Sequence, residues 1–228
     1  MAADPVERWK VSNRMDLVLH AYWRSGTSYR TRIALNLKGL AYRTRPVNLL
    51  AGEQGQDAYL AIDPQGLVPA LEADGQVLIQ SPAILEWLEE TRPAPPLLPT
   101  DPAGRAVVRA MAAVIGCDVH PLNNLRVLRA LKHELGASEA QLAAWEARWI
   151  GDGFAVLEGL IGRHGAGFCH GAAPTLADCY LIPQVYAAIR FGVDLEPYPL
   201  IRAVDRRAGE LAPFAAAHPD RQPDAKPA

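Results

Sequence analysis

The sequence predicts an α/β domain with a mixed four-stranded sheet, followed by an all-helical domain. Strand and helix patterns alternate up to about residue 92, and every pattern after residue 102 is helical. Five prolines, which no continuous helix or strand would tolerate, crowd the segment between the two halves: Pro93, Pro95, Pro96, Pro99 and Pro102. We therefore predict an α/β domain over residues 16–92, a linker over residues 93–102 and a helical domain over residues 103–217.

The α/β half reads as strand, helix, strand, hairpin and helix in chain order. Apolar and alternating patterns predict strands over Leu17–Trp23, Tyr42–Asn48, Pro69–Glu72 and Val77–Ile79. The last two strands flank Asp74-Gly75, a typical hairpin turn. Helices are predicted over Ser28–Lys38 and Pro82–Glu90, the second with Ser81 as its N-cap. Residues 51–62 are polar and read as irregular or weakly helical.

Capping residues mark the helices of the second half. Asp101 precedes Pro102 at the start of a long helix, and Ser138 with Gln141 forms a capping box. Thr175 and Asp178 form another box, which explains Asp178 as a structural residue and opens a helix with a kink expected at Pro183. A last helix is predicted from Pro199 to Leu211. Residues 1–15 and 218–228 are expected to be disordered, and Met15 could be the original start.

Composition limits the possible functions. Half of the 228 residues are hydrophobic and 21% are charged, as in ordinary globular proteins, and the net charge of −2 argues against nucleic-acid binding. No apolar run approaches the roughly 18 residues that span a membrane, and residues 1–15 lack a signal-peptide core. Three widely spaced cysteines suggest neither disulfides nor a metal site. We therefore expect a cytoplasmic protein without metal.

The turn between the first strand and the first helix has the composition of a thiolate site. Ser25, Thr27 and Ser28 follow the apolar run and precede the helix, so hydroxyl groups and unpaired N–H groups lie at the positive end of the helix dipole. Such donors favour the ionised form of a thiol. Helix capping alone would also explain these residues.

Three ordered motifs carry a family resemblance that covers residues 16–214. They are RIALNLKG at residues 32–39, QSPAILEWLEE at residues 80–90 and TLADCY at residues 175–180. With the Trp23–Arg32 turn and the Val68-Pro69 pair, they resemble the zeta class of the glutathione transferase family, which includes maleylacetoacetate and maleylpyruvate isomerases. The resemblance implies a thioredoxin-like first domain, the glutathione transferase fold and glutathione as the cofactor.

The resemblance also implies positions for glutathione. Many zeta-class members have a cysteine where this chain has Thr27, so the reactive sulfur here would come from glutathione. Ser25 and Thr27 are both candidates to donate to that sulfur, and Ser25 is favoured by its family position. The predicted glutathione contacts are Gln54, Val68, Pro69 (held cis in the family), Gln80, Ser81, His120 and Asn124, and Asn123 lies in the same stretch.

Three arginines are candidates for binding a second substrate. Arg24 immediately precedes the thiolate turn, Arg126 follows the stretch His120–Asn124, and Arg190 lies near the end of a predicted helix. Arginine binds carboxylates through two parallel N–H bonds, so two or three arginines near the sulfur would suit a dicarboxylate. Arg24, Ser25 and Thr27 are the predicted catalytic residues, whereas Arg30 and Arg32 are interpreted as structural.

The predicted function is cis–trans isomerisation of a small dicarboxylic keto acid, with maleylpyruvate preferred over maleylacetoacetate. In this reaction type a thiolate adds to the cis double bond, and the resulting single bond rotates before the thiolate leaves. Two alternatives stay open: a conjugating transferase or dehalogenase, and a non-catalytic regulatory module of the same fold. The family resemblance implies a homodimer, and no nucleic acid or membrane partner is expected.

Overall fold

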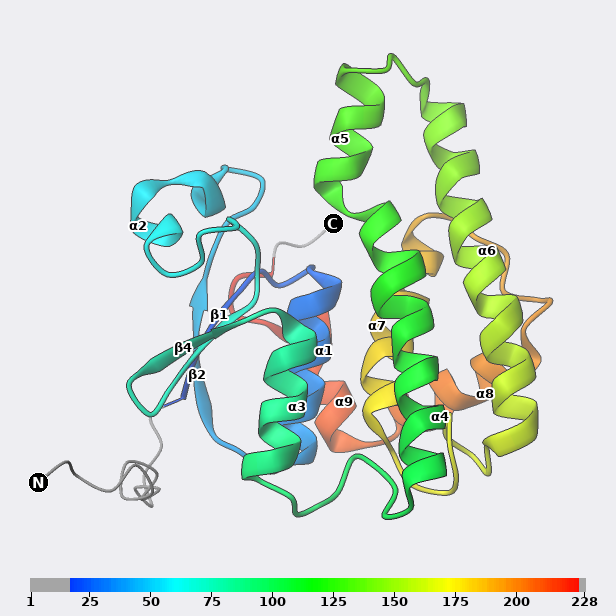
Figure 1. The fold of residues 1–228 in the computed structure, drawn as a ribbon. Helices are drawn as coiled ribbons and strands as arrows, with labels where there is room; N and C mark the ends of the chain where they lie inside the picture. The colour runs from blue at the N-terminus through cyan, green and yellow to red at the C-terminus, as the bar shows by residue number, and fades with distance from the viewer. Residues whose placement is uncertain (1–16, 226–228) are drawn as a thin grey trace, which may run out of the picture.

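A computed structural model describes residues 17–225 of the chain. Figure 1 shows two halves side by side, a sheet with its helices and a group of longer helices. The prediction for residues 1–15 lies outside the described residues. Within the described part, no helix is long and apolar enough to cross a bilayer.

The sheet has four strands and is mixed, as predicted. Strands β1 (Leu17–Ala21), β2 (Tyr42–Pro46), β3 (Ala70–Ala73) and β4 (Gln76–Ile79) lie in the order β2-β1-β3-β4. β1 pairs parallel with β2 and antiparallel with β3, and β3 pairs antiparallel with β4. All five residues of β1 are buried, which explains why this central strand is apolar except for His20.

The two longer helices of the first half differ in how they begin. Ser25 caps α1 (Gly26–Leu37) by accepting a hydrogen bond from the N–H of Ser28, so α1 begins two residues earlier than predicted. Ser81 was predicted to cap the next helix and does not: α3 (Ser81–Thr91) includes it as the first residue, after Gln80 at a φ of 67°. Between β2 and β3 lie a 3₁₀ turn (Glu53–Gly55) and the short α2 (Asp57–Leu60).

The second half is helical. It comprises α4 (Pro102–Ala113), α5 (Leu125–His133), α6 (Glu139–His164), α7 (Leu176–Arg190), α8 (Pro199–Gly209) and α9 (Ala212–Ala217). A π-helical turn (Val114–Val119) and a 3₁₀ turn (His120–Asn123) join α4 to α5, a helix that the sequence analysis missed. The caps predicted at Asp101, Ser138 and Thr175 are confirmed. The predicted helix Pro199–Leu211 ends at Gly209, and α9 starts separately.

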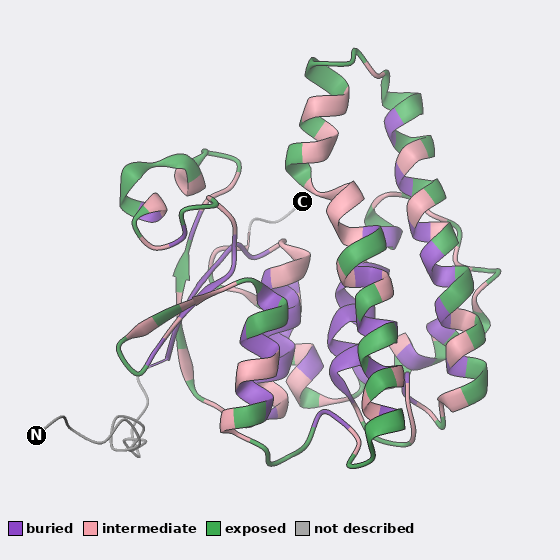
Figure 2. Ribbon diagram, in the orientation of Figure 1, coloured by how far each residue is buried: buried purple, intermediate pink, exposed green. Residues whose placement is uncertain are grey.

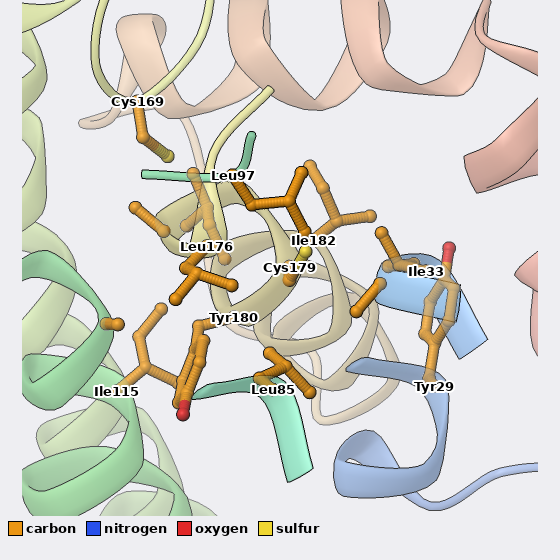
Figure 3. Packing of buried hydrophobic residues seen from close by; sticks show 14 of the residues in the cluster. Tyr29, Ile33, Leu85, Leu97, Ile115, Cys169, Leu176, Cys179, Tyr180 and Ile182 are labelled. Atoms are coloured by element: carbon orange, nitrogen blue, oxygen red, sulfur yellow. The ribbon is translucent and has the colours of Figure 1, made fainter. Parts of the chain in front are cut away.

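One hydrophobic core runs through both halves. Ile33 of α1 and Leu85 of α3 lie in the same buried cluster as Cys179 and Ile182 of α7, and as Ile115 of the π-helical turn (Figure 3). Figure 2 shows the buried residues of α1 and α7 in the centre of the molecule. Because the core is shared, the two halves hold a fixed relative position, and any site between them is built from both.

The segment between α3 and α4 is packed rather than loose. Leu97 and Leu98 are buried, and the carbonyl of Leu97 accepts a hydrogen bond of 2.8 Å from the N–H of Leu176. We retain the division at residues 93–102 as a proposal, based on the change from a mixed sheet to helices.

The end of the chain differs from its predicted disorder. Residues 218–225 include a 3₁₀ turn (Pro219–Arg221), and Asp224 accepts a hydrogen bond from the N–H of Trp23. Prolines and charges in this segment suggested a solvated tail, but its polar groups are used in contacts with the first half.

Candidate active site

A cleft of about 620 Å³ lies between the two halves. One wall consists of the β1–α1 turn and of residues around Leu49, Gln54 and Val68, and the other consists of residues 120–134 and the end of α7. A recess of about 120 Å³ continues it toward the start of α3. All twelve predicted site residues line the cleft or the recess: Arg24, Ser25, Thr27, Gln54, Val68, Pro69, Gln80, Ser81, His120, Asn124, Arg126 and Arg190.

A chain of hydrogen bonds orders the hydroxyl groups of the β1–α1 turn. The hydroxyl of Thr27 donates to the carbonyl of Val68 over 2.7 Å, and Ser25 Oγ lies 2.9 Å from Thr27 Oγ1. A carbonyl only accepts, so the proton of Thr27 is used at Val68 and Ser25 donates to Thr27. The bond between two hydroxyls is the easier one to exchange for a bond to an anion, so Ser25 is the better placed donor for a thiolate.

The loop that contains Val68 has the shape that the resemblance implied. The Val68–Pro69 peptide bond is cis, and both residues are buried. Thr27 fixes the position of the Val68 carbonyl from the opposite side of the recess. The turn at the start of α1 and this loop therefore form one hydrogen-bonded unit.

The start of α3 offers a second group of donors. Arg30 Nη1 donates to Ser81 Oγ over 3.1 Å, so the hydroxyl proton of Ser81 is directed to another acceptor. Ser81 is almost fully buried at the beginning of the helix, where the dipole favours an anion. A carboxylate here would meet the Ser81 hydroxyl and the charge of Arg30 behind it.

Gln80 and Gln54 contribute amide groups around this recess. The positive φ of Gln80 is rare for a residue with a side chain and stores strain of about 1–3 kcal/mol, which is typical of ligand-contacting positions. Its Nε2 contacts Gln65 Oε1. Gln54 Oε1 is buried without a hydrogen-bond partner among the described residues, so it is an acceptor ready for a ligand N–H.

His120 is held as a neutral imidazole. Burial, with the charge of Arg30 as a smaller cause, lowers the pKa of His120 from 6.5 to about 3. Its ring lies beside Gly26, where it borders both the cleft and the recess. At neutral pH, His120 can therefore accept or donate one hydrogen bond but carries no charge.

The three predicted substrate-binding arginines lie around one space. Arg24 comes from the β1–α1 turn, Arg126 from the first turn of α5 and Arg190 from the end of α7. Partial burial and the nearby charge of Arg24 lower the pKa of Arg190, so these two cations lie close enough to repel each other. An anion between them would relieve that repulsion.

The sequence analysis missed part of the site. Arg30 was interpreted only as structural, but its guanidinium supports Ser81, and burial lowers its pKa to about 10. Gln184, which was not predicted, lines a small cavity of about 50 Å³ together with Asn123, which the sequence analysis had placed beside the predicted contacts. Each has a buried amide group without a partner among the described residues. The charged i, i+2 pattern of Arg30 and Arg32 gave no indication that both side chains are buried.

No metal site is visible in the described part of the chain. Residues 17–225 contain no group of three or more His, Cys, Asp or Glu side chains that could hold a metal ion. The three cysteines are free: Cys117 is exposed, whereas Cys169 and Cys179 are buried in the core. Burial raises the pKa of both buried thiols, so they are poor nucleophiles.

Comparison with known proteins agrees with this geometry. The model of the glutathione S-transferase N-terminal domain matches residues 24–91. A maleylpyruvate isomerase of Ralstonia sp is 56% identical over 209 residues, which cover 90% of this chain and 98% of that protein. A maleylacetoacetate isomerase of Pseudomonas aeruginosa is 53% identical, with coverage of 90% and 97%.

Two solved structures are similar over nearly their whole length. The holo structure of a maleylpyruvate isomerase, described as a bacterial glutathione S-transferase in the zeta class, has a TM-score of 0.90 and 55% identity, and the match covers 92% of this chain and 100% of that one. A maleylacetoacetate isomerase of Anaeromyxobacter dehalogenans, with bound dicarboxyethyl glutathione and citrate, has a TM-score of 0.86 and 50% identity, with coverage of 95% and 96%. The chain therefore belongs to the glutathione S-transferase family, and within it to the zeta class.

Proposed function

We propose that this protein is a glutathione-dependent cis–trans isomerase of a small dicarboxylic keto acid, maleylpyruvate or maleylacetoacetate. The observation that carries the proposal is the charge of the cleft next to the thiolate turn. Four arginines line it (Arg24, Arg126, Arg129 and Arg190), against one carboxylate, Glu134. A substrate with two carboxylates matches this excess of guanidinium groups.

The residues of the recess fit glutathione along its length. Ser81, backed by Arg30, suits the carboxylate of the γ-glutamyl end, and Gln80 lies beside it. The backbone of Val68 can pair with the peptide part as an added strand would, and the unpartnered Gln54 Oε1 can accept an N–H group. These contacts direct the cysteinyl sulfur toward Ser25 and the first turn of α1.

The chain's own groups supply three effects in the reaction. Bound glutathione supplies a thiolate that adds reversibly to the cis double bond. Ser25 and the N–H groups of the first turn of α1 lower the pKa of that thiol. Arg24 and Arg190 hold the carboxylates and stabilise negative charge on the substrate while the single bond rotates.

The rival enzyme function fits the cleft less well. A conjugating transferase or dehalogenase acting on apolar compounds would need an apolar second pocket, whereas here arginines surround the space next to Ser25. A non-catalytic module would not need the hydrogen-bonded unit of Ser25, Thr27 and Val68.

A spectrophotometric assay tests the proposal. Purified protein is given maleylpyruvate or maleylacetoacetate, with and without glutathione, and loss of the cis substrate is followed. We expect turnover of at least one of the two, preferably maleylpyruvate, only when glutathione is present. No turnover of either dicarboxylate, together with conjugation of an apolar electrophile, would support the transferase alternative instead.

We also propose a homodimer and a location in the cytoplasm. The dimer follows from the family, and exposed apolar side chains such as Val77 on β4 are available for an interface. Light scattering at micromolar concentration that gives the mass of one chain would contradict the dimer. The cytoplasmic location is supported by the three free cysteines.

A further inference from the structure

The turn that leads into the site leaves the backbone N–H and carbonyl of one residue, Trp23, without local partners. The N–H of Ser25 donates to the carbonyl of Tyr22 over 3.0 Å, so Trp23 and Arg24 are the central residues of this turn. The hydrogen bond that closes the turn uses neither the N–H nor the carbonyl of Trp23. Both groups belong to a buried residue and need partners from elsewhere.

The end of the chain provides those partners. The N–H of Trp23 donates to Asp224 Oδ2 over 3.0 Å, although 201 residues separate the two. The carbonyl of Trp23 accepts from Arg32 Nη2 over 2.9 Å, and Arg32 Nε donates to the carbonyl of Ala217 over the same distance. Asp224 also lies close enough to Arg32 to favour its charged form. Trp23 is thus held on both sides.

The segment that carries Asp224 is itself fixed. Gln222 Nε2 donates to the carbonyls of Ala216 and His218, over 3.0 and 2.9 Å. Ala225 packs against the buried cluster that includes Tyr22 and Trp23. We call residues 217–225 the C-terminal strap.

The position of Trp23 affects the two residues that follow it. The guanidinium carbon of Arg24 lies 5.2 Å from the centre of the Trp23 ring, so a shift of Trp23 moves Arg24. Ser25 comes next in the chain and caps α1. A displacement of about 1 Å at such groups can lower a rate by about a hundredfold.

We propose that the C-terminal strap positions the site through a single side chain: Asp224 is a positioning residue that holds Trp23 and thereby orients Arg24 and Ser25. Asp224 lines neither the cleft nor the recess, so it acts through Trp23. The catalytic readout rests on the isomerase function proposed above, and the structural readout does not.

The test compares three variants of the full chain. Asp224→Ala removes the acceptor, and Asp224→Asn keeps an oxygen that can accept from Trp23. Asp220→Ala is the matched control, because Asp220 lies in the same strap but pairs with His218, 3.6 Å away, and is exposed. Hydrogen exchange of the Trp23 amide is measured by NMR, together with kcat, KM and binding of glutathione and of S-(1,2-dicarboxyethyl)glutathione.

We expect Asp224→Ala to speed exchange of the Trp23 amide about tenfold and to lower kcat by about tenfold. Binding of dicarboxyethyl glutathione should weaken more than binding of glutathione, because Arg24 faces the added carboxylates. Asp224→Asn should keep the exchange rate of the Trp23 amide and kcat close to their wild-type values. Asp220→Ala should match the wild type. Unchanged Trp23 exchange, or faster exchange with unchanged kcat and unchanged binding of dicarboxyethyl glutathione, would overturn the proposal.

Two further comparisons keep the result interpretable. If Asp224→Ala does not fold, Asp224→Glu takes its place. The glutamate keeps the negative charge but moves the acceptor oxygen by one methylene. Equal behaviour of the Asp224→Glu and Asp224→Asn variants would refute the positioning role. If the wild type has no isomerase activity, the proposed function fails. Exchange of the Trp23 amide and the affinities for glutathione and dicarboxyethyl glutathione then still decide whether Asp224 orients the turn.

Discussion

At the scale of single residues, the hydroxyl groups of Ser25 and Thr27 differ in the acceptor to which each donates its hydrogen bond. The hydroxyl of Thr27 donates a hydrogen bond to the Val68 carbonyl, and the hydroxyl of Ser25 donates one to Thr27. Only the second bond can be exchanged for one to a sulfur anion without leaving a buried carbonyl unpaired. The geometry therefore distinguishes two residues that look equivalent in the sequence: Thr27 fixes the loop, and we propose that Ser25 is the donor to the sulfur of the ligand.

Substitution of each hydroxyl separates these roles. We expect Ser25→Ala to lower kcat by about tenfold to a hundredfold, because a charge-assisted hydrogen bond contributes about 1.5–3 kcal/mol. Thr27→Val keeps the shape but leaves the Val68 carbonyl without its donor, so it should mainly weaken glutathione binding. Steady-state kinetics and calorimetric titration with glutathione measure both. The reverse pattern would show that Thr27 is the donor to sulfur.

The lowered pKa of His120 predicts a loss of stability in acid. The unfolded chain takes up this proton near pH 6.5, whereas the folded protein resists until about pH 3. Stability from this residue is therefore complete above pH 6.5 and falls as the pH drops toward 3, by about 2 kcal/mol at about pH 5. His120→Gln should lose less stability than the wild type between pH 7 and pH 5 in urea unfolding. Parallel curves for the two proteins would contradict the assignment.

At the scale of elements, a buried ion pair connects α1, α3 and the segment after α3. Lys38 Nζ lies 2.5 Å from Glu89 Oε2, and it also donates to the carbonyls of Arg92 and Pro95. Glu89 accepts in turn from the N–H groups of Leu97 and Leu98. The pair thus satisfies backbone groups of a proline-rich segment that forms no helix or strand.

Breaking this pair should be costly. We expect Lys38→Met to lower the free energy of unfolding by about 3–5 kcal/mol, because it leaves the buried side chain of Glu89 without its cation. The control is Lys132→Met, which removes the exposed pair between Lys132 and Glu139 and should cost at most about 1 kcal/mol. Urea unfolding measures both. Similar losses in the two variants would show that burial of the first pair has no special effect.

At the scale of the whole molecule, the site exists because two halves share one core. α7 packs against α1 through that core, and its end carries Arg190 to the turn that holds Arg24. α5 has no buried residue and projects from the helical half (Figures 1 and 2). Its Arg126 lines the cleft. The three arginines proposed to bind substrate thus come from elements that are far apart in the chain.

This arrangement predicts which function the arginines serve. Arg126→Lys and Arg190→Lys keep the charge but lose the planar fork, so each should lower kcat/KM for the dicarboxylate by about tenfold and leave glutathione affinity nearly unchanged. Arg148→Lys is a suitable control, because Arg148 is exposed on α6 and does not line the cleft. Wild-type turnover by an Arg126→Ala, Arg190→Ala double variant would mean that neither arginine binds substrate.

Much of the fold could be predicted from the sequence because its signals are local. The caps at Asp101, Ser138 and Thr175 act within three residues, and the apolar run of β1 reflects burial on both faces. The residues that the family motifs indicate for the site all line the cleft or the recess. Where two local signals competed, as at Ser81 with a strained Gln80 before it, the predicted cap was wrong.

The sequence by itself determined the fold class, the order of elements in the first half and the family. Only the tertiary structure decided which groups meet: Arg30 supports Ser81 from 51 residues away, and Asp224 holds Trp23 from a segment predicted to be disordered. Such contacts leave no periodic pattern, because a buried arginine or a paired aspartate reads like a solvated one. Long-range packing, rather than local preference, supplies the partner that makes burial of such a charged side chain favourable.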